Sequence, residues 1–331
     1  MNALLLAVII AATNRGVLVA RSGSLEMFDR TATNVIWNSD GVSTPARIIT
    51  SNDQAAIIDS LANVVRIVDL NTGRGTTMQT GETPIDGVFV SHQLYLLERD
   101  ARALERIGTD GARASISVAA DPAFLRQSNG KLYVYSRTAG VLQEISISPF
   151  AVKRTATVGA FASDFEVDAK NAYLVYPRAA KIEIVSIAAM KESGNIPVGA
   201  VPVDLAFVSS GTALTARTLA IADPSAKRVW ITQGAESFGQ ALARGFLRGL
   251  IGLGLYGGRE SQFPTGVDRV LVRGSRSYAY DSSTGTLYRF VRSKSSMIAK
   301  SIAPEAFTAG AGGVYVWDDA VRRLQRIERD D

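Results

Sequence analysis

Short apolar runs of four to seven residues recur along most of this chain, and Gly, Asn, Asp and Ser separate them. Many runs alternate apolar and polar positions, which is typical of β-strands joined by tight turns and not of helices. The clearest run carries a tyrosine in a fixed place, and its copies are QLYLLERD (93–100), KLYVYSR (131–137), NAYLVYPR (171–178), RSYAYDSS (276–283) and GVYVWDD (313–319). We expect these tyrosines to pack between neighbouring sheets, with the hydroxyl group reaching an edge.

These runs belong to a repeat of about 40 residues. A similar phrase opens successive units, usually at a proline, and its positions are Pro45, Pro84, Pro122, Ala162, Pro202, Pro264 and Pro304. The steps are 38 to 40 residues, except that 62 residues separate Pro202 from Pro264, which is one period plus an insertion of about 22 residues. The N-terminal segment fits an eighth copy, because Ile9-Ile10 align with Ile48-Ile49.

Four short strands in each unit, with no helices between them, predict a β-propeller, in which each sheet is stable only when packed between neighbours. We therefore predict an all-β fold of four-stranded blades over residues 1–331 as a single domain, with eight blades favoured and seven as the alternative. The units resemble the repeats of YVTN/NHL-like propellers, which open with a proline, an aspartate and apolar residues, as in TPIDGVFV (83–90) and VPVDLAFV (201–208). The resemblance implies the fold and leaves the activity open, because related architectures include binding proteins, lactonase-like enzymes and quinoprotein-like enzymes.

The insertion, at about residues 235–260 within the sixth repeat, is the one stretch with helical spacing. Apolar residues recur there at intervals of three and four, which places them on one face of a helix. We therefore expect a short amphipathic helical segment, rich in Gly and Leu. It either folds onto the propeller and buries its leucines, or contacts a membrane surface or a partner through Phe238, Leu242, Arg244, Phe246, Arg248 and Leu250.

The apolar run at residues 3–12 has two alternative explanations. Its length suits the hydrophobic region of a signal peptide and is too short to cross a bilayer as a helix. The same run stands where the repeat needs the buried inner strand of the first blade, and no Lys or Arg precedes it. A signal peptide would imply an exported or cell-envelope protein, and otherwise we expect a cytoplasmic one.

The composition removes several classes of active site. The chain has no cysteine and a single histidine, His92, so disulfides, thiolate zinc sites, cysteine nucleophiles and multi-histidine metal sites are excluded. We expect His92 to be a solvated turn residue. The net charge is +5, to which residues 263–303 contribute most, and no basic run interleaved with aromatic residues points to nucleic acid.

Two sets of charged residues are candidates for a binding site. The turns between second and third strands carry a basic series and an acidic series, which are Arg99, Arg137, Arg178 and Asp223, Asp281, Asp318. On one rim these arginines would suit carboxylate or phosphate groups, and turns that simply carry solvated charge are the alternative. A third series at the predicted channel mouth is Asp86, Asp164, Asp204 and Asp268. These aspartates either bind Ca²⁺ or accept hydrogen bonds that close the seams between blades.

The sequence therefore predicts a non-catalytic binding or scaffold propeller that recognises a small anionic ligand or a partner protein on one rim. The insertion adds the expectation of a peripheral membrane contact, and nucleic acid is not expected as a partner. We predict no catalytic residues, no resident metal and no cofactor, apart from the Ca²⁺ alternative. A metal-dependent lactonase-like or quinoprotein-like enzyme is the alternative function, because a metal held by carboxylates could act as a Lewis acid.

Overall fold

The computed structural model describes residues 8–198, 201–208, 218–233, 259–273, 276–291, 294–303, 306–310, 313–318 and 321–329. Strands and turns make up nearly all of this part of the chain, whose single helical element is a one-turn 3-10 helix, η1 (Pro177–Ala179). No helix within these ranges is long and apolar enough to span a membrane.

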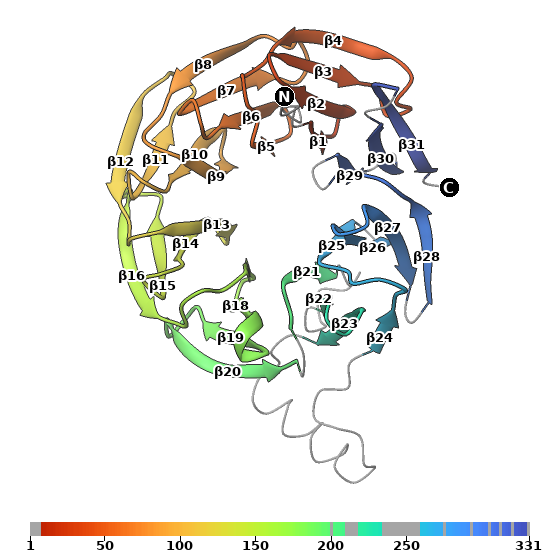
Figure 1. Cartoon of the computed structure of the whole chain (residues 1–331). Helices are drawn as coiled ribbons and strands as arrows, with labels where there is room; N and C mark the ends of the chain where they lie inside the picture. Colours follow the sequence, from red (N-terminus) through yellow and green to blue (C-terminus); the bar gives the residue numbers. More distant parts are fainter. Residues whose placement is uncertain are drawn as a thin grey trace, which may run out of the picture. The chain divides into compact units, whose positions relative to one another are not determined.

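The described chain folds into eight antiparallel sheets that follow one another in sequence (Figure 1), and we number these blades 1 to 8. Consecutive strands pair within each blade, so every blade is a simple meander. The blades fall into two compact units, of which unit 1 is Met1–Ala160 with Ile302–Asp331 and unit 2 is Phe161–Ser301. The prediction of an all-β propeller with eight blades is confirmed, and the seven-bladed alternative is wrong.

Unit 1 contains blades 1 to 4 and blade 8. Their strands are β1 (Ile9–Ala12), β2 (Val17–Arg21), β3 (Ser24–Phe28) and β4 (Val35–Asp40); β5 (Arg47–Thr50), β6 (Gln54–Asp59), β7 (Val64–Asp69) and β8 (Gly75–Gln79); β9 (Pro84–Val90), β10 (Gln93–Glu98), β11 (Ala103–Ile107) and β12 (Arg113–Ser117); β13 (Pro122–Ser128), β14 (Lys131–Ser136), β15 (Val141–Ser146) and β16 (Ala151–Thr157); and β29 (Phe307–Gly310), β30 (Gly313–Asp318) and β31 (Arg323–Arg329).

Unit 2 contains blades 5 to 7. Their strands are β17 (Asp164–Val167), β18 (Asn171–Tyr176), β19 (Lys181–Ser186) and β20 (Lys191–Pro197); β21 (Asp204–Val208), β22 (Thr218–Asp223), β23 (Arg228–Gln233) and β24 (Arg259–Gln262); and β25 (Arg269–Arg273), β26 (Arg276–Asp281), β27 (Thr286–Val291) and β28 (Lys294–Ala299).

The burial of a strand depends on its place in the blade. Second strands such as β6 and β10 are buried at nearly every position, because neighbouring blades of the same unit cover both of their faces. Fourth strands such as β12 alternate exposed and half-buried positions, because their outer edge meets solvent. The apolar clusters therefore lie between blades, as where Leu18 and Leu25 of blade 1 pack with Ile57 of blade 2.

The repeated tyrosines are buried, and Tyr95, Tyr173 and Tyr315 contact the adjacent blade of their own unit, as the sequence predicts. Those of the second strands expose 2% of their surface or less, and they are Tyr95, Tyr133, Tyr173, Tyr278 and Tyr315. The ring of Tyr95 meets Phe150 of blade 4 edge-on, with 5.6 Å between ring centres. The hydroxyl group of Tyr315 donates to the carbonyl oxygen of Arg30 in blade 1 at 2.7 Å.

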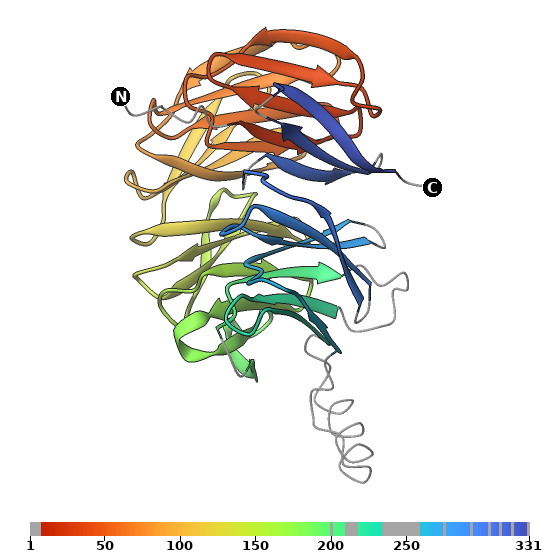
Figure 2. The same ribbon diagram turned by 45° about the vertical axis from the view of Figure 1, so that its right-hand side comes forward.

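Within unit 1, blades 8 and 1 lie side by side (Figure 1 and Figure 2), so the two ends of the described chain pack together as adjacent blades. The Ala12 N–H of β1 donates to Oγ1 of Thr308 in β29 at 3.2 Å, and the Arg21 guanidinium lies 5.0 Å from the ring centre of Trp317. Residues 9–12 of the apolar N-terminal run form β1, and residues 1–7 lie outside the described residues.

The insertion interrupts blade 6 between β23 and β24. Residues 234–258 lie outside the described residues, and with them the predicted helix and its contact residues Phe238, Leu242, Arg244, Phe246, Arg248 and Leu250. β24 begins at Arg259, so the last two residues of the predicted insertion belong to a strand. Pro304, the predicted start of the last unit, also lies outside the described part.

Candidate functional site

In each blade, the turn between the second and third strands lies at the same end as the connections between blades, and we call this end the turn face. The Arg137 N–H, for example, donates to the Asp121 carbonyl oxygen in the connection that leads into blade 4, at 2.8 Å. Arg99 and Arg178 are exposed in such turns, and Arg137 is half-buried. Arg99 and Arg137 belong to unit 1, whereas Arg178 belongs to unit 2.

The basic and acidic series of the turns occupy different positions in the repeat. Asp223, Asp281 and Asp318 are the last residues of second strands. Arg99 and Arg137 come one residue after their strands, and Arg178 comes two residues after. The residue of blade 3 that is equivalent to Asp223 is therefore Glu98, and in blade 4 it is Ser136. Asp223 and Asp281 are completely buried, so neither presents a carboxylate at the surface.

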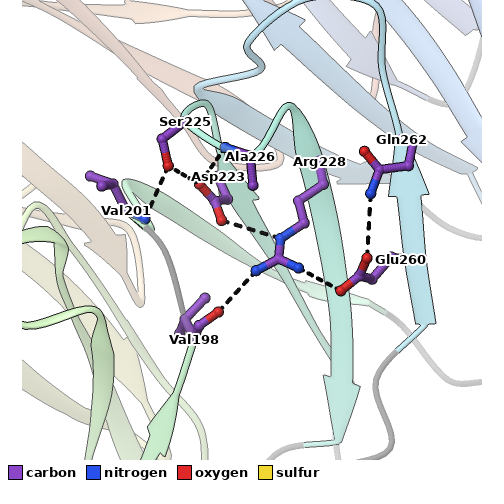
Figure 3. Close-up of polar contacts among 8 residues, drawn as sticks. All are labelled: Val198, Val201, Asp223, Ser225, Ala226, Arg228, Glu260 and Gln262. Carbon is purple, nitrogen blue, oxygen red and sulfur yellow. Dashed lines mark hydrogen bonds and ion pairs between the residues drawn. The ribbon is translucent and has the colours of Figure 1, made fainter.

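Asp223 organises the turn face of blade 6 (Figure 3). Its Oδ1 accepts hydrogen bonds from Ser225 Oγ at 2.8 Å and from the Ala226 N–H at 3.1 Å. Its Oδ2 accepts one from Nε of Arg228 at 3.2 Å. The same guanidinium donates to Glu260 on the fourth strand at 2.5 Å and to the Val198 carbonyl oxygen at 3.0 Å. One aspartate thus closes a turn and orients an arginine that ties the third strand to the fourth.

Asp281 closes the equivalent turn of blade 7 through Ser283 and Thr284. Ser283 donates from its N–H at 2.9 Å and its hydroxyl group at 2.6 Å, and Thr284 donates from Oγ1 at 2.7 Å. Burial acts to raise the pKa of Asp281, but the hydroxyl groups of Ser283, Thr265 and Thr284 outweigh it and hold the pKa below its usual value. This carboxylate is therefore ionised and serves the turn.

Asp86 connects three consecutive blades of unit 1. It is 2% exposed, and its Oδ2 accepts the Leu125 N–H of blade 4 at 3.0 Å. Its carboxylate also pairs with Arg47 of blade 2 at 3.0 Å and with Arg126 of blade 4 at 3.3 Å. Two guanidinium groups therefore balance the buried charge of Asp86, and its oxygen atoms are engaged across the blade boundaries.

Asp164 and Asp204 make the same bond between blades in unit 2. The Leu205 N–H of blade 6 donates to Asp164 Oδ2 at 2.9 Å, and the Val270 N–H of blade 7 donates to Asp204 Oδ2 at 2.7 Å. Burial raises the pKa of Asp204 well above its usual value, and the neighbouring Asp164 carboxyl group raises it further. Asp204 therefore retains its proton at pH values at which an exposed aspartate has lost it.

Asp268 differs from the other three aspartates of the predicted channel-mouth series. It lies just before β25 and accepts hydrogen bonds from the N–H and the hydroxyl group of Ser282 in its own blade. The series thus contains three carboxylates that bond to the next blade and one that bonds to a turn of its own blade.

Blade 3 contains a pair of buried carboxyl groups, Glu98 and Glu105, which the sequence analysis did not predict. Glu98 is 3% exposed, and its Oε1 accepts the Gly81 N–H at 2.6 Å. The pKa of Glu98 is raised to about 7, mainly by burial. The hydrogen bond from the Gly81 N–H lowers this pKa, and the neighbouring Glu105 carboxyl group raises it further. The Arg113 guanidinium donates two hydrogen bonds to the Glu105 carboxylate, at 2.6 and 2.7 Å. The one sequence signal for this pair is a glutamate where other blades have the turn-closing aspartate.

The turn face carries exposed apolar side chains, which the sequence prediction also omits. In unit 1, Leu61 is 82% exposed in the turn of blade 2 and Val321 is 62% exposed in the turn of blade 8. In unit 2, Phe161 and Val201 are exposed in the connections that lead into blades 5 and 6. The turns between first and second strands instead expose polar residues, which in unit 1 are Asn14, Asn52, His92 and Asn129. Exposed apolar residues beside arginines are typical of protein interfaces.

The groups needed for a metal centre do not gather in the described residues, where no set of three or more His, Cys, Asp or Glu residues is placed to hold a metal ion. His92 lies in the turn between β9 and β10 with 65% of its side chain exposed, and its Nδ1 is 3.6 Å from Asp53 Oδ2. It is the solvated turn residue that the sequence predicts.

Eight consecutive antiparallel blades, which bury apolar residues between neighbours within each unit, define the chain as a β-propeller protein. No known family model matches its sequence. No curated protein matches it in sequence either.

Solved structures with the same architecture include hydrazine synthase of Kuenenia stuttgartiensis, at 15% identity and a TM-score of 0.63 over 86% of this chain and 95% of that one. Virginiamycin B lyase of Staphylococcus aureus has 12% identity and a TM-score of 0.59 over 82% and 90% of the two chains. BamB of Moraxella catarrhalis has 13% identity and a TM-score of 0.59 over 83% and 80%. At these identities the similarity shows the fold alone.

Proposed function

We propose that this protein is a non-catalytic β-propeller that binds a partner protein through its turn face. The observation that carries the proposal is the exposure of Leu61 and Val321 at turn tips of unit 1, where turns normally carry polar residues. Arg99 and Arg322 are exposed in turns of the same unit, and arginine with apolar side chains is the composition of a protein interface. A partner protein therefore suits this surface better than a small anionic ligand, because ligand sites are concave and these apolar side chains stand exposed at turn tips.

The use of the buried acidic groups supports a non-catalytic role. Asp86, Asp164 and Asp204 accept backbone N–H groups of the next blade, and Asp223 and Asp281 close turns. A general acid or base needs a free, accessible position next to a substrate. In a lactonase-like or quinoprotein-like enzyme, the catalytic or metal-binding carboxylates would have to be aspartates that already bond to the next blade.

Three finer assignments belong to the same proposal. The repeats are of the YVTN/NHL-like kind, which the Pro-x-Asp openings at Pro84 and Pro202 support. A membrane contact through the insertion, and with it an envelope location, stays a prediction because the insertion lies outside the described residues. Bound Ca²⁺ stays the alternative to the prediction of no cofactor.

Affinity capture with matched variants tests the proposed function. The double variant Leu61→Ser and Val321→Ser should fold normally, because both side chains are exposed and contribute little to the core. Its capture of the specific partner from native extract should fall about ten-fold or more, as expected when two interface side chains are truncated. Quantitative mass spectrometry of the captured proteins measures this fall.

Met297→Ser is the matched control, because Met297 is an exposed apolar residue on the fourth strand of blade 7, away from the turns. This variant should capture the same proteins as the unmodified chain. Equal capture by the double variant and the control would contradict the proposal.

A further inference from the structure

The first strands of blades 2, 3 and 4 carry a row of residues at equivalent positions. Arg47, Asp86 and Phe124 each lie opposite the penultimate residue of the second strand in their own blade. Within unit 1, β5 contacts β9 and β9 contacts β13 (Figure 1), so the three residues follow one another across neighbouring strands. Because second strands end at the turn face, the row lies close to that face.

Three guanidinium groups surround this row. Arg47 pairs with Oδ1 of Asp86 at 3.0 Å, and Arg126 pairs with Oδ2 of the same carboxylate at 3.3 Å. The guanidinium groups of Arg126 and Arg137 each lie 5.7 Å from the ring centre of Phe124, which is a cation–π distance. We call Arg47, Arg126 and Arg137 the arginine set. Its members are held in position by these contacts, which lowers the entropy cost of binding.

The arginine set carries more positive charge than the seam between blades requires. One guanidinium would already balance the single negative charge of Asp86, which is 2% exposed. In blades 6 and 7 the residues equivalent to Arg126 are Ala206 and Leu271, because each directly follows the N–H donor of the bond between blades. That bond therefore does not depend on an arginine at this position.

Two members of the arginine set are able to bind a further anion. The Arg47 side chain is 48% exposed, and among the described residues its guanidinium pairs with Asp86 alone. The guanidinium of Arg137 forms no hydrogen bond or ion pair within the described part of the chain. The carboxylate of the neighbouring Asp121 accepts the Thr138 N–H at 3.2 Å. Three guanidinium groups and the carboxylates of Asp86 and Asp121 thus leave a net positive charge.

From this we infer that the arginine set binds a carboxylate of the partner protein, an Asp or Glu side chain that accepts hydrogen bonds from Arg47. A guanidinium group matches a carboxylate in shape and charge, and such pairs are stronger than neutral hydrogen bonds. The inference rests on the proposed function, because it adds a charged contact to the same interface.

The position of Leu61 supports a shared interface. Asp59 accepts the Ala62 N–H at 2.9 Å beside Leu61, and it also accepts the N–H of Thr44, in the connection that leads to Arg47, at 2.7 Å. Leu61 and Arg47 therefore lie at the same end of blade 2. A partner that fits this end presents an acidic side chain close to an apolar one.

Titration with a defined dicarboxylate tests the inference without the partner. The probe is acetyl-Glu-Glu-amide, and NMR follows the Nε–H signals of the full chain prepared with isotope-labelled arginine. The signals of Arg47 and Arg137 should shift in a saturable way, and acetyl-Gln-Gln-amide, which has no charge, should move neither. Arg47→Gln should raise the Kd measured at Arg137 about three- to five-fold, the size of one exposed ion pair.

Arg74→Gln is the matched control, because Arg74 is an exposed arginine of unit 1 in a turn between third and fourth strands, at the opposite end of the blades. It should leave Kd unchanged. The double variant Leu61→Ser and Val321→Ser should bind the probe as the unmodified chain does, so the titration and the capture experiment of the proposed function can fail separately.

Capture of the specific partner links the probe site to the interface. Arg47→Gln should fold, because Arg126 and the Leu125 N–H still contact Asp86, and it should capture less of the partner than Arg74→Gln does. Unsaturable shifts at Arg47 and Arg137, a Kd that Arg47→Gln does not change, or equal capture by the two variants would each overturn the inference.

Discussion

The last residue of the second strand makes different hydrogen bonds in different blades, depending on whether it is an aspartate or a glutamate. Asp223 and Asp281 have short side chains and close the turn that follows them. Glu98 has one more methylene group, so its carboxyl group reaches the Gly81 N–H instead, at 2.6 Å. A Cβ atom at position 81 would lie 2.3 Å from Glu98 Oε2, so a larger residue there would displace the Glu98 carboxyl group. The result is a buried carboxyl group beside Glu105.

The raised pKa of Glu98 predicts a specific pH dependence. The pKa is about 7 in the folded protein and 4.5 for an ordinary glutamate, so across this window the folded state keeps a proton that the unfolded chain has lost. The free energy of unfolding should therefore fall as the pH rises through this window. Glu98→Gln keeps an acceptor for Gly81 and should gain on the order of 1 kcal/mol at pH 8, with little change at pH 4.

Urea unfolding at several pH values measures this difference. Glu82→Gln, at an exposed glutamate in the connection that leads into the same blade, is the control and should follow the unmodified chain at every pH. A Glu98→Gln variant whose stability relative to the unmodified chain does not change with pH would contradict the assigned pKa.

At the scale of elements, the first strands hold neighbouring blades together by more than apolar packing. The first strands of adjacent blades contact one another within each unit, and Asp86 and Asp164 place a carboxylate at such a contact. Each carboxylate accepts a backbone N–H of the next blade, which a meander sheet alone leaves without a partner. The seams between blades therefore depend on a few buried acidic groups.

Asp86→Ala should be strongly destabilising, because it leaves Arg47, Arg126 and the Leu125 N–H without their common acceptor. We expect a loss of about 3 kcal/mol in the free energy of unfolding, the usual cost of removing one member of a buried ion pair. Asp40→Ala, at an exposed aspartate that ends β4, should change it by less than about 0.5 kcal/mol. Chemical denaturation measures both, and equal stability of the two variants would contradict the role of Asp86.

At the scale of the whole molecule, the insertion is an addition to a complete blade. β23 and β24 pair directly, with Ile231 opposite Arg259, so the strands on either side of the insertion are already adjacent. Deleting residues 236–257 would leave three residues between β23 and β24, a common loop length for a β-hairpin. The propeller should therefore fold without the insertion.

Melting temperature and liposome co-sedimentation of the deletion variant test this prediction. We expect a soluble protein with a melting temperature within a few degrees of the full chain, and loss of a lipid or partner contact. An aggregated deletion variant would show instead that the insertion covers apolar blade surface.

The architecture could be predicted from the sequence because each repeat of about 40 residues contains the pattern of one blade. Units opening near Pro84 and Pro122 became β9 and β13, and Tyr95 became an interblade residue, since fixed spacing within 40 residues determines both. The site was less predictable. The turn series mixed Arg99 with Asp223 because β10 ends at Glu98, one residue before the arginine. Bonds such as Asp204 to Val270 join residues 66 positions apart across the insertion, and no local pattern reports them.

The central claim is that a partner protein contacts the turn face, and site-specific cross-linking at position 61 tests it most directly. A photo-reactive benzoylphenylalanine in place of Leu61 keeps an apolar side chain at the 82% exposed turn tip. Illumination in native extract should yield one major cross-linked protein, and the same label in place of His92, in an exposed turn at the opposite end of the blades, should yield none. No cross-link at position 61, or the same products from both positions, would contradict the claim.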